Sequence, residues 1–259
     1  MEPAEYDRLY ALELEHWRFR AVRRLVTRAL RRHAPAPAGG RLRLLDAGCG
    51  CGGTTVALGE LGAAVGVDLH PRALHWAARR GVPALARARV EALPFADGSF
   101  DAVVSVDVLY HRAVADDAAA LGELARVCRE GGVVVLWLPA FEALRSSHDA
   151  LVHTARRYTR ARVAALARAA GLEVAWLTGI GAVLAPLAWL RARLERRGAQ
   201  ARSALSATPR PLNAALAGLL ALEGAAALRV PLPLGVSFLA VLRKPAARAP
   251  APGTLRDPG

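Results

Sequence analysis

The sequence predicts an α/β protein with a doubly wound, mostly parallel sheet of seven strands and helical cap elements. Three observations support this fold class. Between residues 41 and 139, short apolar stretches alternate with helical ones, as in parallel sheets covered on both faces. The stretch VVVLWLP at 133–139 is apolar throughout, which is typical of a strand buried on both sides. A chain of 259 residues with 54% hydrophobic content is also long enough to bury one substantial core.

Residues 4–33 are predicted to form one amphipathic helix. Apolar side chains recur every three or four residues, as one face of a helix requires, and arginines occupy the remaining faces. The apolar positions are Tyr6, Tyr10, Leu14, Trp17, Ala21 and Leu25. The turn APAPAGG at 34–40 ends this helix, so residues 1–38 are expected to form an N-terminal cap helix.

Five strands and three helices are expected between this cap and Pro139. The strands are predicted at 41–48, 63–70, around 82–88, 100–109 and 133–139. The helices are predicted at 54–62, 71–81 and 114–132. Pro71 lies near the first turn of the second helix, where proline is favoured, and the paired glycines 131–132 are expected to end the third.

The pattern changes after Pro139. A polar loop rich in His and Arg is expected at 140–158, a helix at 159–171 and a strand at 172–179. Two apolar helices follow at about 182–197 and 211–228, then a last strand at 235–244. We therefore expect a catalytic domain at 39–244 with a helical insertion at about 180–230, and a disordered tail at 245–259. Both apolar helices are too short to span a bilayer, and charged or proline residues interrupt them.

Composition excludes several classes of protein. The first residues are acidic and lack an unbroken apolar run, so no signal peptide is expected. Three cysteines make no disulfide framework, which indicates a reducing, cytoplasmic location. Cys49 and Cys51 have no second Cys/His pair at a zinc-like spacing, so no metal site is expected.

The net charge of +13 would ordinarily indicate nucleic acid or an anionic membrane as partner. Lys244 is the single lysine and alanine is abundant, which is typical of a GC-rich genome. The charge therefore indicates mainly a solvated basic surface. Contact with an acidic partner stays open.

The stretch LLDAGCGCGGTTVAL at 44–58 predicts a ligand-binding glycine bend. Its glycines at 48, 50 and 53 fit a dinucleotide fingerprint, while those at 48, 50 and 52, preceded by Asp46, fit a loop around S-adenosylmethionine. A carboxylate at position 46 suits a cofactor without phosphates and with a cationic end. Asp68, at the end of the second strand, can accept ribose hydroxyls in either fold and does not discriminate.

Further motifs distinguish the two cofactors. Together with LLDAGCGCG and GVDLH, the stretches EALPFADGSFDAVVS and ARVCREGGVVVLWLP resemble class I S-adenosylmethionine-dependent methyltransferases of the small-molecule, ubiquinone/menaquinone methylase-like (type 11) group. The resemblance covers about residues 40–140. The segment SSHDALVHTARRYTRARVAALARAAGLEV is similar to the same region of a bacterial subgroup. The resemblance implies a Rossmann-like methyltransferase fold and S-adenosylmethionine as cofactor.

The family pattern also implies roles for individual residues. The methionine end of the cofactor would lie against Asp46, Gly48, Cys49, Gly50 and Gly52, and the ribose against Asp68 and Leu69. Glu91 and Leu93 would flank the adenine, whose edge the backbone near Val90 would read. Many relatives carry an acid or small polar residue at the position of Arg89, which cannot accept a hydrogen bond. This departure implies adenine recognition by backbone groups alone, or weaker binding.

Methyl transfer from a sulfonium mainly requires alignment, and a base helps when the acceptor carries an acidic proton. Such groups should stand at the carboxyl ends of the fourth and fifth strands. Asp107, which can balance the cofactor's charge, and His111 follow the fourth strand. The loop after the fifth supplies His148, Asp149, His153 and Arg157 as a segment over the pocket. We predict His111, His148 and His153 as catalytic candidates; His148 and His153 are five apart, which argues against paired metal ligation.

The sequence thus predicts methyl transfer to a small, hydrophobic or lipid-like acceptor. An RNA-modifying methyltransferase that grips phosphates through its arginines, a nicotinamide-dependent oxidoreductase and a non-catalytic relative are the alternatives, although no RNA-binding module is recognisable. The two apolar helices suit the core or a homodimer interface. Beside Arg191, Arg193, Arg196 and Arg197 they also suit peripheral contact with an anionic membrane.

Overall fold

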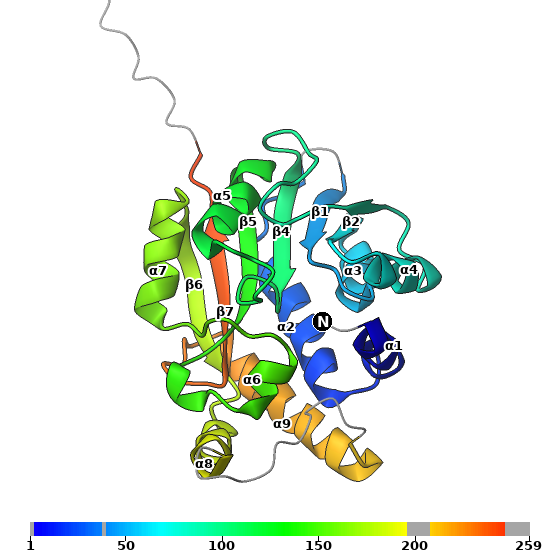
Figure 1. The fold of residues 1–259 in the computed structure, drawn as a ribbon. Coiled ribbons are helices and arrows are strands. Elements are labelled where there is room, and N and C mark those ends of the chain that lie inside the picture. Colours follow the sequence, from blue (N-terminus) through cyan, green and yellow to red (C-terminus); the bar gives the residue numbers. More distant parts are fainter. Residues whose placement is uncertain (1–2, 38–39, 196–207, 247–259) are drawn as a thin grey trace, which may run out of the picture.

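Seven strands form one sheet in the computed structural model, which describes residues 3–37, 40–195 and 208–246 (Figure 1). The strand order is β3-β2-β1-β4-β5-β7-β6, and only β7 runs antiparallel to its neighbours. This confirms the predicted fold class. The strands are β1 (Leu42–Ala47), β2 (Gly62–Asp68), β3 (Leu85–Arg87), β4 (Phe100–Val106), β5 (Cys128–Pro139), β6 (Glu173–Ile180) and β7 (Ser237–Arg243).

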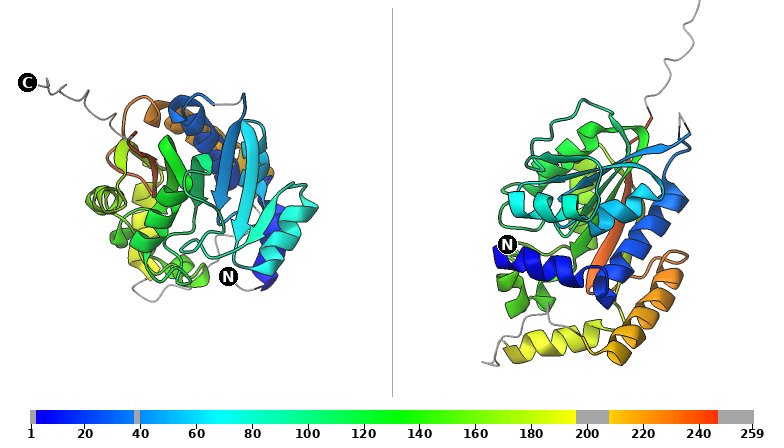
Figure 2. Two further views of the ribbon diagram at one scale, coloured as in Figure 1. Left: turned by 90° about the horizontal axis from the view of Figure 1, so that it is seen from above. Right: turned by 90° about the vertical axis from the view of Figure 1, so that its right-hand side faces the viewer.

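Helices cover both faces of the sheet, as Figure 2 shows from two further directions. One hydrophobic core joins the sheet to α5 and α7, and a second joins its other face to α2, α3 and α9. Neighbouring residues of a strand alternate between these cores: Leu45 belongs to the first and Leu44 to the second. The described helices are α1 (Pro3–Leu12), α2 (Trp17–His33), α3 (Gly53–Gly59), α4 (Pro71–Arg79), α5 (Asp117–Val127), α6 (Ser147–Leu151), α7 (Arg160–Ala169), α8 (Ala185–Glu195) and α9 (Arg210–Ala227).

The prediction of one helix over 4–33 is wrong, because the chain turns between α1 and α2. His16 caps the N-terminus of α2 by accepting from the N–H of Arg18. The Arg23 guanidinium donates to the carbonyl oxygens of Glu13 and Leu14 and so fixes the turn. Helix α1 then leaves the line of α2 and packs on α4, where the ring of Tyr10 stacks on Trp76.

The prediction of a helix over 114–132 is also wrong at both ends. Asp116 caps α5 through the N–H groups of Ala118 and Ala119, and the helix stops at Val127 rather than at glycine. Strand β5 starts at Cys128 and bulges opposite Asp101, since Phe100 pairs with Cys128 but Ala102 pairs with Val133. The Arg129 guanidinium reaches back to the Asp101 carboxylate at 2.6 Å and holds this bulge.

The segment beyond β5 contains more structure than the loop predicted for 140–158. A 3-10 turn, η1 (Glu142–Leu144), and the short helix α6 lie within it. The two apolar helices of the insertion are present as α8 and α9 between β6 and β7. Among the described helices, none has the length and apolar character needed to cross a bilayer. The predicted tail falls almost entirely on residues 247–259, outside the described part of the chain.

The Asp101 carboxylate is expected to contribute strongly to stability. It is 2% exposed and accepts both from Arg129 and, at 2.7 Å, from the backbone N–H of Arg43. Asp101→Asn should lower the free energy of unfolding by about 1–3 kcal/mol in urea titrations, because hydrogen bonds to a charged acceptor are lost. The matched variant Asp97→Asn removes an ion pair with Arg126 whose acid is 80% exposed, and should cost below about 0.5 kcal/mol.

The same pair of variants should differ in pH dependence. Burial alone would raise the pKa of Asp101, but the Arg43 N–H and the Arg129 guanidinium lower it below its usual value. A depressed folded-state pKa adds stability above the unfolded value of about 3.9 and loses it as the pH falls through the folded value. The deficit of Asp101→Asn should therefore shrink on acidification below about pH 4. A deficit that stays constant, or that Asp97→Asn matches, would contradict this assignment.

Candidate active site

A cavity of about 300 Å³ opens at the carboxyl ends of β1, β2 and β4. It lies where the strand order reverses between β1 and β4, the usual ligand position in doubly wound sheets. Helix α1, the start of α2 and helix α6 surround it, and Figure 1 shows these helices gathered below the strand ends. The lining therefore combines the strand ends with segments that lie far away in the sequence.

The glycine bend between β1 and α3 forms one wall of the cavity. Gly48 and Gly50 line it, with φ of +88° and +54°, in the left-handed region that favours glycine. A Cβ on Gly48 would lie 2.2 Å from Cγ2 of Val108, so the bend and the end of β4 touch only because that atom is missing. Gly52 lies outside the lining, and a Cβ there would strike Val82 and Ala77 instead.

Asp46 lies beneath the bend, outside the lining of the cavity. Its side chain is 1% exposed and accepts a hydrogen bond of 2.6 Å from the hydroxyl of Thr55. Burial raises the pKa of Asp46 to about 7. The structure thus gives this residue a bond that fixes α3 against β1, while the expected direct contact with the cofactor stays a prediction.

Asp68 stands at the end of β2 and does line the cavity, together with Leu69 and Cys49. Its two oxygens accept from the backbone N–H groups of Gly50 at 2.9 Å and His70 at 2.8 Å. The N–H of Leu69 also bonds to this carboxylate, which with about four lone-pair sites can still accept a hydroxyl donor. Burial raises the pKa of Asp68.

Arg89, Val90 and Glu91 line the same half of the cavity. The Arg89 guanidinium donates to Glu91 at 3.1 Å and to the carbonyl of Ala113 at 2.9 Å. Glu91 also accepts from the N–H of Ala115 at 3.1 Å. The arginine that departs from the family pattern therefore ties the β3 side of the cavity to the loop after β4.

The sequence analysis missed Glu13, which faces the glycine bend from the turn after α1. Its carboxylate is 7% exposed, lines the cavity and lies 3.3 Å from the Arg80 guanidinium. It also accepts from the N–H of Gly53, and burial raises its pKa. One signal was available, since Glu13 and Glu15 are the only acids between Leu9 and Ala34 in an arginine-rich stretch. We did not use this signal, because we expected one unbroken helix there.

The opposite half of the cavity centres on Asp107. This residue follows β4 with φ of +60°, a left-handed conformation that is strained for a side chain other than glycine. Its carboxylate accepts from the Arg18 guanidinium at 2.7 Å and from the hydroxyl of Tyr110. Arg18, which the sequence analysis also missed, comes from the first turn of α2 and is 36% exposed. All three side chains line the cavity.

Of the three histidines predicted as catalytic, His111 and His148 line this half of the cavity. His153 is not among the lining residues. His111 accepts from the N–H of Ala113 at 3.0 Å through Nδ1, and burial lowers its pKa to about 4. His148 projects from α6; burial and then Arg18 lower its pKa to about 4, and its buried Nδ1 has no hydrogen-bond partner. His153 has φ of +55°, and its ring lies 5.6 Å from that of His111.

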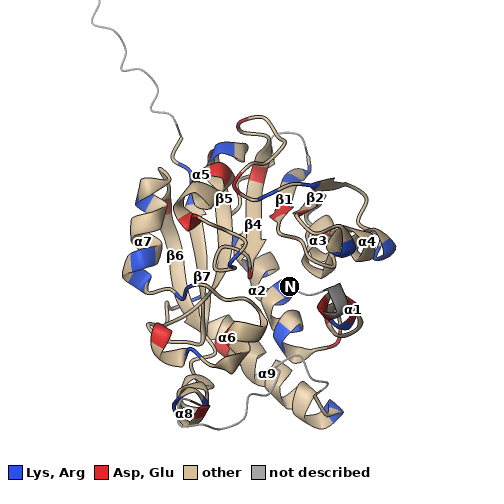
Figure 3. Ribbon diagram, viewed as in Figure 1, with Lys and Arg blue, Asp and Glu red and all other residues tan. Residues whose placement is uncertain are grey.

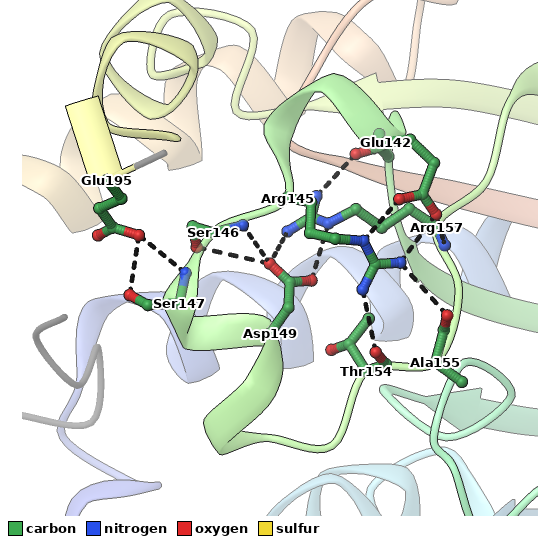
Figure 4. Close-up of polar contacts among 10 residues, drawn as sticks. Glu142, Arg145, Ser146, Ser147, Asp149, Thr154, Ala155, Arg157 and Glu195 are labelled. Atoms are coloured by element: carbon green, nitrogen blue, oxygen red, sulfur yellow. Dashed lines mark hydrogen bonds and ion pairs between the residues drawn. The ribbon is translucent and has the colours of Figure 1, made fainter. Parts of the chain in front are cut away.

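Ion pairs fix the segment that contains η1 and α6, which carries His148 (Figure 4). Asp149, 3% exposed, binds the Arg157 guanidinium at 2.8 and 3.1 Å, and Glu142 binds Arg145 at 2.6 Å. Glu195 of α8 accepts from both the N–H and the hydroxyl of Ser147, each at 2.8 Å. Asp149 and Arg157 therefore bond to each other, and neither is among the residues that line the cavity.

Residues 45–136 match the family model described as "Methyltransferase domain". An uncharacterised protein from a Streptomyces fradiae transposon is 37% identical over 124 residues, which are 45% of this chain and 35% of that protein. An uncharacterised methyltransferase of Mycobacterium leprae is 40% identical over 114 residues, 41% of each chain. The chain thus spans less than half the length of these curated relatives.

Solved structures extend the likeness over nearly the whole chain. The methyltransferase in a complex with the Haloferax volcanii activator Trm112 has a TM-score of 0.63 and 22% identity, covering 95% of this chain and 97% of that one. The geranyl diphosphate C-methyltransferase of Streptomyces coelicolor, in complex with Mg²⁺, geranyl diphosphate and S-adenosyl-L-homocysteine, has a TM-score of 0.52 and 18% identity, covering 84% and 76%. At these identities the likeness is one of fold.

The contact between Gly48 and Val108 gives a direct test of the bend. Gly48→Ala should lower the free energy of unfolding by about 1–3 kcal/mol, because the left-handed φ is strained for alanine and the added Cβ overlaps Val108. Gly59→Ala is the matched control, since Gly59 lies in α3 and a Cβ added there would meet no atom within 4 Å. It should change the stability by less than about 1 kcal/mol. Equal urea midpoints for the two variants would show that the bend tolerates a side chain.

Proposed function

We propose that this chain, whose residues 45–136 match the methyltransferase-domain model, is a class I methyltransferase that transfers a methyl group from S-adenosylmethionine to a small apolar acceptor. The observation that carries the proposal is the division of one cavity into two halves. The glycine bend and Asp68 line one half, and Asp107, Arg18, Tyr110 and His148 line the other. A cofactor in the first half would face an acceptor in the second.

The residues of the first half fit S-adenosylmethionine. Gly50 faces the cavity without a Cβ, so the backbone can approach the methionine portion closely. We assign the cofactor's ammonium to Glu13, whose Oε2 has an ion pair with Arg80 but no hydrogen bond. Asp68 would accept from the ribose hydroxyls, and the segment around Val90 would flank the adenine. When bound, the cofactor supplies an electrophilic methyl group on a positively charged sulfur.

The residues of the second half suit an acceptor that attacks through oxygen. Aliphatic and aromatic side chains form the walls there: Phe19, Val22, Val106, Val108 and Val152. The Arg18 guanidinium stabilises a developing oxyanion and disfavours a cationic amine. His148, neutral at physiological pH, presents an unpartnered Nδ1 to which a hydroxyl can donate. The enzyme would thus hold the acceptor in line with the methyl group and exclude water.

The RNA-modifying alternative has less support than the small-molecule one. Of the three arginines that line the cavity, Arg23 is bonded to the α1–α2 turn and Arg89 to Glu91, so only Arg18, which donates to Asp107 through one nitrogen, can also meet an anion of the ligand. Basic residues in Figure 3 are spread over several elements, with acidic residues interspersed among them. A phosphate-gripping site would instead present unpaired cations in one place.

Calorimetric titration tests the cofactor assignment. The wild-type protein should bind S-adenosylmethionine and not NADH. Glu13→Gln and Asp68→Asn should each weaken binding about tenfold, equivalent to about 1.4 kcal/mol, because each removes a charged acceptor. Glu15→Gln is the matched control, because it changes a neighbouring exposed acid and should leave the affinity unchanged. Binding of NADH, or equal affinities for all four proteins, would contradict the assignment.

Turnover measurements test the acceptor half. Against a panel of phenols, hydroxylated lipids and amines, methyl transfer should favour the hydroxyl compounds. Arg18→Gln should lower kcat/KM about 100-fold, since it removes one stabilising donor of the developing oxyanion, while the cofactor affinity stays unchanged. Arg20→Gln, two residues along the same helix, should have little effect.

The pH profile separates this role of Arg18 from a purely structural one. Burial and the Arg18 charge keep the pKa of His148 low, so Arg18→Gln should raise it. The acid limb of the kcat/KM profile should therefore move to higher pH in that variant. Selective turnover of amines, or an unshifted acid limb, would contradict the oxyanion assignment.

A further inference from the structure

Helix α8 turns its large apolar side chains away from the protein. Val183, just before the helix, and Leu187, Leu190 and Leu194 within it are 58%, 67%, 47% and 48% exposed. Their spacing of four, three and four residues puts them on one side of the helix. The opposite side, toward the protein, carries the small residues Ala185, Ala188 and Ala192. This arrangement inverts the usual pattern of a surface helix and leaves an apolar stripe in solvent.

An arginine flanks this stripe on each side. At about 100° per residue, Arg191 and Arg193 fall on either side of the line through Leu187, Leu190 and Leu194. The Arg193 guanidinium lies 5.5 Å from the ring centre of Trp189, which is itself 44% exposed. An apolar stripe bordered by arginine and tryptophan is typical of helices that lie in a membrane interface.

One acid of the insertion offsets part of this charge, because the Glu195 carboxylate pairs with the Arg191 guanidinium at 2.7 Å. Within the described parts of α8 and α9, the only acidic residues are Glu195 and Glu223. Glu195 accepts from Ser147, and Glu223 accepts from the N–H groups of Gly181 and Ala182. Both carboxylates are therefore bonded to the chain's own backbone. The exposed Arg193 pairs with neither of these acids, so the outward side of α8 combines aliphatic groups with one cation that they do not neutralise.

The helix that carries the stripe lies at the same end of the molecule as the cavity. Figures 1 and 2 place α8 at the end of the molecule toward which β4 runs, the end where the cavity opens. The bond from Ser147 to Glu195 joins α8 directly to α6, whose His148 lines the cavity. A surface that covers the stripe would thus lie beside the wall formed by α6.

We propose that the α8 stripe, defined as Val183, Leu187, Leu190 and Leu194, docks the protein on an anionic lipid surface. The aliphatic side chains would enter the boundary between headgroups and acyl chains, and Arg193 would contact a lipid phosphate. Charge complementarity favours this occupant over a second copy of the chain. A twofold contact through α8 would set the same arginine-bordered face against itself. The inference concerns binding alone and does not rest on methyl transfer.

Vesicle flotation without cofactor tests the proposal on the full chain. The wild-type protein should float with vesicles of phosphatidylcholine and phosphatidylglycerol, float less with phosphatidylcholine alone, and dissociate as salt is added. The triple variant Leu187→Ser, Leu190→Ser, Leu194→Ser should bind at least about tenfold more weakly, because the inserted apolar groups are lost. Arg193→Gln should weaken binding about fivefold, and only to the anionic vesicles.

Controls distinguish docking through α8 from nonspecific hydrophobic binding and from misfolding. Val56→Ser and Val174→Ser change aliphatic residues, 43% and 41% exposed, on α3 and β6, and should bind vesicles as the wild type does. Circular dichroism melts check that the triple variant folds, and light scattering gives the mass of each protein. The proposal is overturned if the wild type ignores anionic vesicles or the control variants lose binding equally. It is also overturned if the stripe holds a dimer together while vesicles are not bound.

Discussion

The left-handed bend between β1 and α3 is the constraint on which the site depends. The N–H groups of Gly48 and Cys49 both donate to the carbonyl of Val67, at 2.7 and 2.8 Å, and that of Gly50 donates to Asp68. The bend is thereby fixed to the end of β2, and only glycine permits its backbone conformation without strain. Because Gly48 has no Cβ, Val108 packs against it and sets the distance between the bend and the end of β4.

Ion pairs then fix the charged groups around this frame. Arg80 with Glu13 and Arg18 with Asp107 each join a carboxylate of the lining to a guanidinium from a different helix, whereas Arg89 and Glu91 pair within one turn. Partly buried pairs of this kind add little net stability, because desolvation offsets their attraction. Their effect is on geometry. They hold carboxylates at both ends of the cavity in defined positions.

Local sequence patterns were sufficient to predict the strands, the glycine bend and the position of Asp68, since these depend on residues close together in the chain. The break after α1 was not predictable in this way, because Arg23 bonds to carbonyls about ten residues earlier and α1 is held by α4. The start of β5 depends likewise on Asp101, in the neighbouring strand. Glu13 and Arg18 reach the cavity only through these turns. The spacing of apolar residues indicates which side of a helix is buried, but it does not indicate where the helix is interrupted.

Two walls of the cavity, formed by α6 and by α1, are fixed by ion pairs. The α6 wall is held by Asp149 and Arg157, whose side chains are 3% and 11% exposed, and removing one partner of a buried pair costs about 3–5 kcal/mol. Helix α1 is held on α4 by Asp7 and Arg72, 42% and 46% exposed, and by the stacked rings of Tyr10 and Trp76. An exposed pair contributes only about 0–1 kcal/mol. The α1 side also has a buried pair, because the side chains of Arg80 and Glu13 are 6% and 10% exposed and Arg80 donates to the carbonyl of Tyr10 at 2.9 Å. Each wall therefore depends on one buried guanidinium–carboxylate pair, to which the exposed pair of Asp7 with Arg72 adds little.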